Sequence, residues 1–257
     1  MKPLEGLHVL ITRPAAQAGG ICSLIEAEGG TAVRFPSIAI APPNDSRPAK
    51  ALLTRSDWDR VIFISANAVH AALELGGDWQ HRPLVAVGNA TRKALLAAGL
   101  KVSLTPTDGF NSEALLALPE LQTVAGERML IVRGEGGRET LADTLRKRGA
   151  LLEHAEVYRR TMPATDPAEL LQIWADGGID VVTVTSNESL TNLLAMLGDT
   201  GHKLLIDTPL VGVSERVLQH AASLGLPNPP IVAASAHDTD VLATLIAWRR
   251  SSGPRND

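Results

Sequence analysis

The sequence predicts an α/β protein whose two related lobes each carry a parallel β-sheet flanked by helices. Three observations support this fold class. Short apolar runs alternate with helical stretches, one three-part pattern occurs twice, and proline-rich segments interrupt the chain in two places. The chain has 257 residues, of which 45% are hydrophobic, so it is long enough to bury one large core or two smaller ones.

The predicted strands are short apolar runs rich in Val and Ile. Most of them precede a stretch in which apolar residues recur at helical spacing, for example Ala90, Ala94, Leu95 and Ala98. This alternation is typical of βα units, whose strands pair in parallel. The runs occupy residues 8–12, 60–65, 84–88, 128–132, 180–186 and 210–214.

The repeated pattern has three pieces, which occur in the same order both times. The first is a strand that leads into an arginine, a helix, a glycine and an extended run, as in "HVLITRP" and "MLIVRGE". The second is a strand ending in serine before a helix, and the third is a strand, a turn and a helix that stops at glycine. Equivalent positions are Thr12 and Val132, Ser65 and Ser186, and Gly88 and Ser214.

The proline-rich segments suggest where one lobe ends and the other begins. A simple duplication would place one boundary near residue 122, but the breaks lie at 35–50 and 159–170. They indicate that one lobe is inserted into the other. We therefore expect an inserted domain at 41–157, a discontinuous domain made of 1–36 plus 163–257, and a disordered tail at 251–257.

Composition excludes several classes of protein. The formal net charge is −4, so general attraction to nucleic acid is not expected. Cys22 is the single cysteine, which excludes an internal disulfide, and we expect it to be a buried thiol. No apolar run approaches the ~18 residues of a membrane span, and the start of the chain does not resemble a signal peptide. We expect a cytoplasmic protein without a membrane or nucleic-acid partner.

Two motifs suggest ligand sites but also have simpler explanations. "RGEGGRE" (133–139) follows a strand, yet Glu139 stands where a dinucleotide fingerprint needs its third glycine. A nucleotide-dependent transferase therefore stays open only as a third hypothesis. "HDTD" (237–240) offers possible metal ligands, but Asp238 is explained more simply as a helix N-cap, and we expect no metal. Ser65 and Ser186 lack the setting of a catalytic triad.

The remaining candidates are residues at helix N-termini that follow parallel strands. A helix start offers free N–H donors and a partial positive charge, so it binds carboxylate or phosphate. Arg13, Arg133 and Arg138 would add full charges, although Arg13 and Arg133 could instead pair with structural carboxylates, and each polar residue could simply cap its helix. The candidate binding residues are Thr12, Arg13, Ser65, Ala66, Asn67, Gly88, Thr91, Arg133, Gly134, Arg138, Ser186, Asn187, Ser214 and Arg216.

Taken together, these segments resemble one family over nearly the whole chain. "LITRP", "FISANAV", "AVGNATRKAL", "RGEGGRETLADTLRKRGA…VYRR" and "TSNESL" occur in the order seen in uroporphyrinogen-III synthases. The most specific part is the segment from Arg133 to Arg159. The resemblance implies two flavodoxin-like domains, one of them discontinuous. They would be joined by a two-stranded linker at about 36–41 and 157–163, with the active site in a cleft between them.

The resemblance also implies an activity. Members of this family are cofactor-free lyases of tetrapyrrole biosynthesis, which supplies haem, sirohaem and cobalamin. They cyclise the linear tetrapyrrole hydroxymethylbilane to uroporphyrinogen III with loss of water and inversion of ring D. We expect a monomer that receives the bilane by transient handover from hydroxymethylbilane synthase. The alternative from another class is a two-lobe binding protein for a small polyanionic ligand.

Individual residues carry over from the family where its motifs match. Tyr158 matches a tyrosine proposed to assist departure of the hydroxyl, although it could be only a packing residue of the linker. Thr91 matches a hydroxyl residue at a helix start, and Ser65 and Ser186 match serines after two equivalent strands. At 214–217 this chain lacks the family's threonine, so a side-chain role there is in doubt, and Arg216 is the candidate to replace it.

Overall fold

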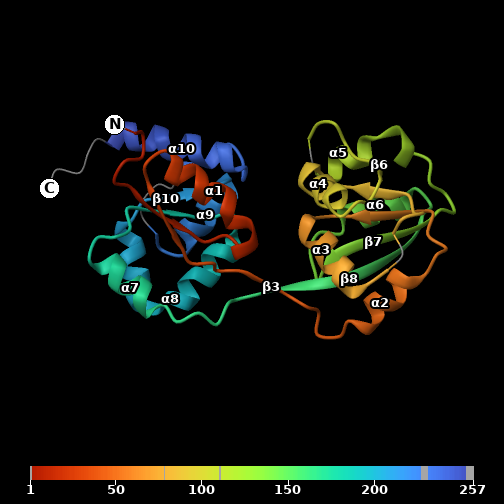
Figure 1. The fold of residues 1–257 in the computed structure, drawn as a ribbon, viewed down its shortest axis with the longest axis horizontal. Coiled ribbons are helices and arrows are strands. Elements are labelled where there is room, and N and C mark those ends of the chain that lie inside the picture. The colour runs from red at the N-terminus through yellow and green to blue at the C-terminus, as the bar shows by residue number, and fades with distance from the viewer. Residues whose placement is uncertain (1, 78, 110, 227–230, 253–257) are drawn as a thin grey trace. The chain divides into compact units, whose positions relative to one another are not determined.

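The computed structural model describes residues 2–252 except residues 78, 110 and 227–230. It divides into two compact units (Figure 1). Unit 1 contains Met1–Ala39 and Thr161–Asp257, and unit 2 contains Ile40–Arg160. Each unit is a sheet of largely parallel strands flanked by helices, so the predicted α/β class is confirmed.

In unit 1 the described residues form a five-stranded parallel sheet in the order β11-β10-β9-β1-β2. The strands are short and apolar, and nearly every residue of the three central ones is buried, as expected for a sheet covered on both faces. Their bounds are β1 (His8–Ile11), β2 (Thr31–Arg34), β9 (Val181–Thr183), β10 (Leu210–Gly212) and β11 (Ile231–Val232).

Helices cover both faces of the unit 1 sheet, as Figure 1 shows for α1 and α10 on one side and α7 and α8 on the other. Successive strand residues point to opposite faces. Val9 therefore packs with the first pair of helices, and Leu10 packs with α7, α8 and α9. The helices are α1 (Ala15–Ala27), α7 (Ala168–Ala175), α8 (Asn187–Asp207), α9 (Glu215–Ser223) and α10 (Asp238–Ser252).

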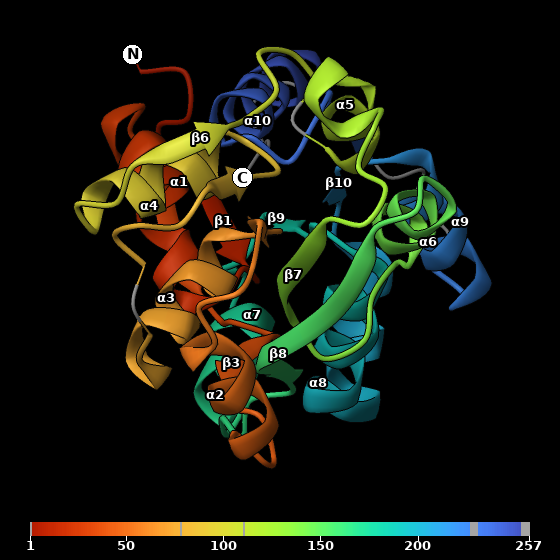
Figure 2. The same ribbon diagram turned by 90° about the vertical axis from the view of Figure 1, so that its right-hand side faces the viewer.

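In unit 2 the described residues form a six-stranded sheet in the order β3-β8-β7-β4-β5-β6. Strands β8, β7, β4, β5 and β6 pair in parallel, and Figure 2 shows β7 and β8 running side by side. The strands are β3 (Ala39–Ala41), β4 (Arg60–Phe63), β5 (Leu84–Ala86), β6 (Val102–Leu104), β7 (Arg128–Gly134) and β8 (Leu151–Thr161).

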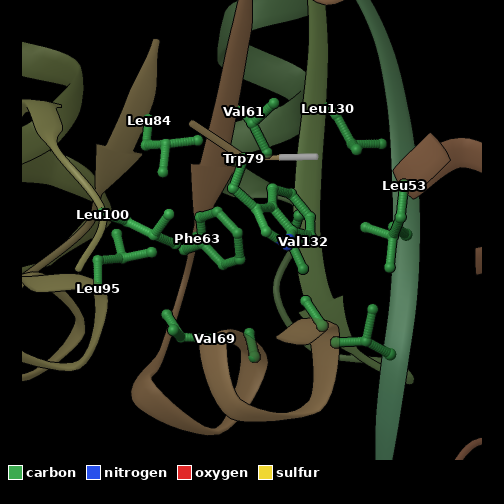
Figure 3. Packing of buried hydrophobic residues seen from close by; sticks show 14 of the residues in the cluster. Leu53, Val61, Phe63, Val69, Trp79, Leu84, Leu95, Leu100, Leu130 and Val132 are labelled. Carbon is green, nitrogen blue, oxygen red and sulfur yellow. The ribbon is translucent and has the colours of Figure 1, made fainter. Parts of the chain in front are cut away.

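The unit 2 core has the same two-sided design. On one face Phe63 lies among side chains of α2, α3 and α4 (Figure 3), with its ring 5.4 Å from that of Trp79 in an edge contact. On the other face Ile62 packs against α5, a 3₁₀ turn (Pro119–Leu121) and α6. The helices are α2 (Arg47–Thr54), α3 (Ala66–Leu75), α4 (Asn89–Ala97), α5 (Ser112–Ala117) and α6 (Thr140–Lys147).

The two sheets are circular permutations of one arrangement. If the strands of unit 1 are numbered 1 to 5 along the chain, their order in the sheet, read from β2 to β11, is the flavodoxin-like 2-1-3-4-5. Unit 2 has the same arrangement apart from the added β3, but its chain starts at the third strand of the pattern and ends with the first two. Strands β1, β9 and β10 are therefore equivalent to β7, β4 and β5, which are the pairs that the repeated sequence pattern matched.

All six predicted strands occur in the structure, and two expectations differ from it in detail. Ser251 and Ser252 are the last residues of α10, where a disordered tail was expected from residue 251. The helical conformation continues to this point, and Ser251 Oγ donates to the Trp248 carbonyl at 2.8 Å within the helix. Residues 253–257 of the expected tail lie outside the described residues. The expected linker strands correspond to β3 and to the end of β8, which is a full strand of the unit 2 sheet.

Candidate functional site

Each sheet has a point at which the strand order reverses, and the candidate residues gather there. In unit 1 the chain runs from β1 to β2 in one direction and from β9 to β11 in the other, so the reversal lies between β1 and β9. In unit 2 it lies between β7 and β4. Open α/β sheets bind ligands at the carboxyl ends of the strands beside such a reversal. Thr12 and Ser186 follow the two strands in unit 1, and Gly134 and Ser65 are at the corresponding ends in unit 2.

Ser65 and Ser186 are N-caps with the same local geometry. Ser65, before α3, has φ −159° and ψ 161°, and Ser186, before α8, has φ −161° and ψ 162°. Each Oγ accepts a hydrogen bond of 3.1 Å from the backbone N–H three residues later, at Ala68 and Ser189 respectively. Capping satisfies one donor of the first turn, and the positive end of the helix dipole at such a start favours an anion. Ala66–Asn67 and Asn187 form these first turns.

The next strand in each unit leads to a second helix start without a side-chain cap. Gly88 precedes α4 and Ser214 precedes α9, both in extended conformation and neither with a side-chain hydrogen bond to the helix. Three residues on, Thr91 is 4% exposed and its counterpart Val217 is 1% exposed. Arg216 is exposed on the first turn of α9. The position where the family threonine is missing is thus a buried apolar residue beside an exposed arginine.

Thr12 belongs to a buried hydroxyl network in unit 1. Its side chain is fully buried, and its Oγ1 donates to the Thr183 carbonyl at 2.7 Å and lies 2.9 Å from Ser189 Oγ. Ser189 Oγ lies 2.9 Å from Ser37 Oγ, and Asn192 donates to the Ser37 carbonyl at 2.9 Å. These bonds tie the ends of β1 and β9 to α8, so the Thr12 hydroxyl stabilises the site from within the protein.

Arg13 pairs with a carboxylate of the protein, which was the alternative to its role as a free cation for a ligand. Its guanidinium is hydrogen-bonded to Asp238 at the start of α10 and donates to the Ala236 carbonyl at 2.7 Å. Asp238 is the first residue of the helix and not its N-cap. It lies against Gly20 of α1, where a side chain would collide with its carboxylate. Arg13 therefore holds the loop before α10 close to the end of β1.

Arg133 is likewise paired, and it is buried inside the loop that the sequence motif "RGEGGRE" forms. It is 3% exposed, donates to Glu139 Oε1 at 2.6 Å, to the Gly134 carbonyl at 3.3 Å and to the Gly136 carbonyl, and lies 3.2 Å from His154 Nδ1. The hydrogen bond from Arg133 lowers the pKa of Glu139, while burial lowers the pKa of His154.

Because of this loop, α6 begins later in the chain than the sequence predicted. Gly134 is the last residue of β7, and α6 begins only at Thr140, because residues 135–139 fold around the Arg133 side chain. The N–H groups of Glu135 and Gly136 already donate to the Tyr158 carbonyl and to Glu156 Oε1, at 2.8 and 3.3 Å. The loop is thus not the anion-binding helix start expected at Gly134. Arg138 is exposed on it.

Tyr158 joins Gly134 and Ser65 at the reversal point of unit 2. It is 3% exposed and belongs to the same apolar cluster as Phe63 and Val157. Its hydroxyl lies 3.3 Å from Ser65 Oγ, at the N-terminus of α3. The structure thus brings together a phenolic hydroxyl, a capping serine and a helix start.

Sequence reasoning missed several partners that shape these positions. Ser37, Ser189, Asn192, Glu139 and Asp238 all contact a predicted site residue or its network. Only Ser189 could have been found from the sequence. It stands three residues after Ser186, at the position whose backbone N–H a capping serine accepts. Ser37, Asn192 and Asp238 meet their partners across 152 or more positions of chain. Glu139 meets Arg133 only six positions away, but in a loop that no regular spacing marks.

The described residues contain no group of three or more His, Cys, Asp or Glu side chains placed to hold a metal ion. Among the helices of that part of the chain, none is both long enough and apolar enough to cross a membrane. Cys22 is a free, buried thiol on α1.

These features define a class of protein, namely a pair of flavodoxin-like α/β units with helix N-termini at the strand-order reversal of each sheet. The family model described as uroporphyrinogen-III synthase HemD matches residues 21–243. The chain therefore belongs to the uroporphyrinogen-III synthase family.

Relatives of this chain carry the same name. The uroporphyrinogen-III synthase of Salmonella typhimurium strain LT2 is 36% identical over 244 residues, covering 92% of this chain and 98% of the relative. That of Escherichia coli strain K12 is 34% identical over 243 residues, with the same coverage of 92% and 98%.

Solved structures share the fold at low identity. A mutant uroporphyrinogen III synthase from the extremely thermophilic bacterium Thermus thermophilus has a TM-score of 0.59 at 17% identity, covering 96% of this chain and 99% of that one. A uroporphyrinogen-III synthetase from Helicobacter pylori 26695 has a TM-score of 0.61 at 15% identity, covering 95% and 99%. They support the two-unit α/β architecture.

Proposed function

We propose that this chain is a lyase that cyclises hydroxymethylbilane to uroporphyrinogen III, with loss of water and inversion of ring D. The observation that carries the proposal is family membership across residues 21–243, together with uroporphyrinogen-III synthases that are 36% and 34% identical to this chain. The geometry of the candidate residues adds physical reasons, which concern how the substrate is held and how its hydroxyl leaves.

The substrate carries acetate and propionate side chains, so its binding residues must hold several separated carboxylates. Helix N-termini suit this task because their free N–H groups and positive dipole ends bind anions without a buried counter-charge. Ser65-Ala66-Asn67 and Ser186-Asn187 supply one such start in each unit, and Gly88-Thr91 and Ser214 supply two more. The exposed Arg138 and Arg216 add full positive charge nearby in the sequence.

Arg13 and Arg133 have a different role in this proposal from the one expected of free cations. Both guanidinium groups are already paired, with Asp238 and Glu139 respectively. They act by fixing the loops that follow β11 and β7, and thereby the backbone beside the helix starts. Thr12 acts similarly through its buried hydroxyl bonds.

Departure of the substrate hydroxyl as water requires a proton, and Tyr158 is the proposed donor. Ser65 Oγ accepts from the Ala68 N–H and can donate its own hydrogen to the Tyr158 oxygen 3.3 Å away. With that orientation the phenolic hydrogen is directed to the substrate. The phenol hydrogen moves to the leaving oxygen as its C–O bond breaks, water departs, and the phenol regains a proton when ring closure releases one.

Control of conformation supplies the rest of the activity. Hydroxymethylbilane cyclises spontaneously without inverting ring D, so an enzyme must chiefly dictate how the chain folds before the ring closes. Holding the reacting ends in one orientation is catalysis by proximity, which needs anchoring groups for the carboxylates and no elaborate acid–base set. The predominance of helix starts among the candidate residues agrees with this requirement.

The test is a product analysis. Purified protein is given hydroxymethylbilane, the product is oxidised, and isomers I and III are separated by chromatography. We expect uroporphyrinogen III to form faster than the spontaneous isomer. Formation of uroporphyrinogen I alone, at the rate seen without protein, would rule out the proposed activity.

The proposal includes a cytoplasmic monomer that takes the bilane by handover from hydroxymethylbilane synthase. Its support is chemical, because a substrate that cyclises by itself is best transferred before it is diluted. A coupled assay with increasing volumes at constant amounts of both proteins tests it. While the two proteins remain associated, handover predicts a constant share of isomer III on dilution, whereas free diffusion predicts a share of isomer I that rises from the first dilution.

A further inference from the structure

We infer that Gly134 is a positioning residue for Tyr158, because the absence of a side chain at 134 is what lets the tyrosine ring lie where its hydroxyl meets Ser65. A Cβ placed on Gly134 would lie 2.6 Å from Tyr158 Cζ, 2.7 Å from Cε2 and 3.1 Å from Cε1. Its three nearest heavy atoms all belong to that ring. The inference rests on the proposed role of Tyr158 and extends it to a residue without a side chain.

The backbone at Gly134 gives no other reason for glycine. Its φ is not in the positive region that favours glycine, unlike the φ of +68° and +103° at Gly136 and Gly137 in the same loop. Alanine could therefore adopt the Gly134 conformation, and the ring of Tyr158 is the obstacle. This separates Gly134 from glycines that a tight turn requires.

The Tyr158 backbone is fixed, so the ring cannot retreat by a shift of the chain. The pairing of β7 with β8 changes register here, from Arg133 opposite Glu156 to Gly134 opposite Tyr158. Beyond this irregularity the Glu135 N–H donates to the Tyr158 carbonyl at 2.8 Å. As a result Val157 and Tyr158 are both buried in one apolar cluster, although neighbouring strand residues normally face opposite sides.

The other end of the ring is fixed by the helix start. The Tyr158 hydroxyl lies 3.3 Å from Ser65 Oγ, whose position is set by its capping bond to Ala68. Carbon atoms in contact prefer separations of about 3.5–4.0 Å, so a methyl group at 134 would push the ring by about 1 Å. That displacement removes the hydroxyl from Ser65, and a misplacement of this size can cost roughly a hundredfold in rate.

The experiment compares Gly134→Ala with Gly19→Ala. Gly19 lies within helix α1, where an added Cβ has no heavy atom within 4 Å, so it is the same chemical change without the obstacle. Tyr158 is the single tyrosine, and protein made with ring-labelled ¹³C-tyrosine therefore gives an NMR signal from this residue alone. We expect the Cζ resonance to move in Gly134→Ala and to stay in place in Gly19→Ala. An unmoved resonance in Gly134→Ala overturns the inference.

Kinetics give the functional readout. We expect Gly134→Ala to lower kcat by roughly tenfold to a hundredfold with little change in KM, since the carboxylate-binding helix starts are untouched. In a Tyr158→Phe background, adding Gly134→Ala should cause no further fall in kcat, because the hydroxyl that it displaces is already gone. An equal fall in both backgrounds would show that Gly134 acts through something else.

Two further results keep this inference separate from the proposed function. If wild-type protein makes no uroporphyrinogen III, the proposed activity fails while the NMR comparison still decides whether Gly134 positions the ring. If Gly134→Ala does not fold, the double variant Gly134→Ala/Tyr158→Ala should be no less stable than Tyr158→Ala alone, since the obstructing ring is absent from both. A further loss of stability on adding Gly134→Ala to Tyr158→Ala contradicts the inference.

Discussion

Ser65 and Ser186, which cap helices in different units, share their backbone angles to within 2° in φ (−159° and −161°) and 1° in ψ (161° and 162°). Each follows the strand on one side of its sheet's reversal point, and each accepts a 3.1 Å bond from the N–H three residues later. The repeat first seen in the sequence is thus a repeat of conformation, and it makes the two positions directly comparable by mutation.

Removing either cap should destabilise its unit by a similar amount. We expect Ser65→Ala and Ser186→Ala each to lower the free energy of unfolding by about 1 kcal/mol, because each orphans one N–H of a helix start. Ser214→Ala is the matched control, since Ser214 makes no side-chain bond to α9. Urea denaturation measures all three. A loss in Ser214→Ala as large as in the other two would contradict the capping explanation.

Tyr158→Phe should lower turnover and leave the fold intact. The ring stays in its apolar cluster, and only the hydroxyl that meets Ser65 is lost. We expect kcat to fall by roughly a hundredfold, in the range typical of a lost general acid, with KM nearly unchanged. The measurement is the initial rate of uroporphyrinogen III formation, with circular dichroism as the control for folding. Unchanged turnover would remove Tyr158 from the mechanism.

Thr12→Val tests the buried hydroxyl network of unit 1. Valine has nearly the same shape, but it leaves the Thr183 carbonyl and Ser189 without the Thr12 hydroxyl. We expect a loss of about 1–3 kcal/mol in the free energy of unfolding, the cost of unsatisfied buried polar groups. Thr144→Val on the exposed side of α6 is the control, because its hydroxyl bonds only to its own helix. An equal loss of free energy of unfolding in the two variants would show that the hydroxyl network does not stabilise unit 1.

Arg133→Met should destabilise unit 2 far more than Arg138→Met. Arg133 is 3% exposed and holds the loop 134–139 through Glu139 and two carbonyls, whereas its neighbour Arg138 is exposed. Losing these charge-assisted bonds should cost about 2–4 kcal/mol, and the Arg138 change should lie within about 0.5 kcal/mol. Thermal unfolding measured by calorimetry checks both variants. Similar melting temperatures for the two would contradict a clamping role for Arg133.

The surroundings of Arg133 should also make stability fall in acid. Burial lowers the pKa of His154 below its ordinary 6.5, so the unfolded chain takes up this proton at a higher pH than the folded one. The hydrogen bond from Arg133 lowers the pKa of Glu139 below 4.5, which works in the same direction. The stabilising contributions of His154 and Glu139 are therefore fully present when the pH is above both ordinary pKa values. Stability falls first as the pH drops below about 6.5 and again below about 4.5.

His154→Gln separates the two steps. It should remove the loss of stability that begins near pH 6.5 and keep the one that begins near pH 4.5. Urea midpoints at about pH 8, 5.5 and 4 measure both steps. The exposed His70→Gln on α3 controls for the loss of a histidine as such. A wild-type pH profile in His154→Gln would contradict the explanation.

Much of the fold was predictable because its signals are local. Strands such as 60–63 and 128–134 are buried on both faces and stand out as apolar runs. The edge strands β2, β6 and β11 are short and partly exposed, so no comparable run marks them. The repeated pattern identified the equivalent strands. That their chain order is permuted follows from sheet pairing, which a single sequence does not display.

The candidate site was predictable only in part, because only some of its residues are marked by a local pattern. The capping serines follow from a strand-to-helix boundary that the sequence shows directly. The partners of the arginines do not, since Arg13 meets Asp238 across 225 positions of chain. At Gly134 the pattern of strand, glycine and helix was misleading, because the Arg133 side chain holds five residues of loop before α6 begins. A long-range contact decided the case of Arg13, and an irregular loop around one buried side chain decided that of Gly134.

The insertion of unit 2 between the two parts of unit 1 has a consequence for synthesis on the ribosome. All strands of the inserted sheet lie within one continuous stretch, so it can form once residue 161 has emerged. The segment from β1 to β2 is made before the inserted sheet but finds its neighbour β9 only after it, as the 171 positions between Thr12 and its partner Thr183 show. Strands β1 and β2 therefore wait for the rest of their sheet while the whole of unit 2 is translated.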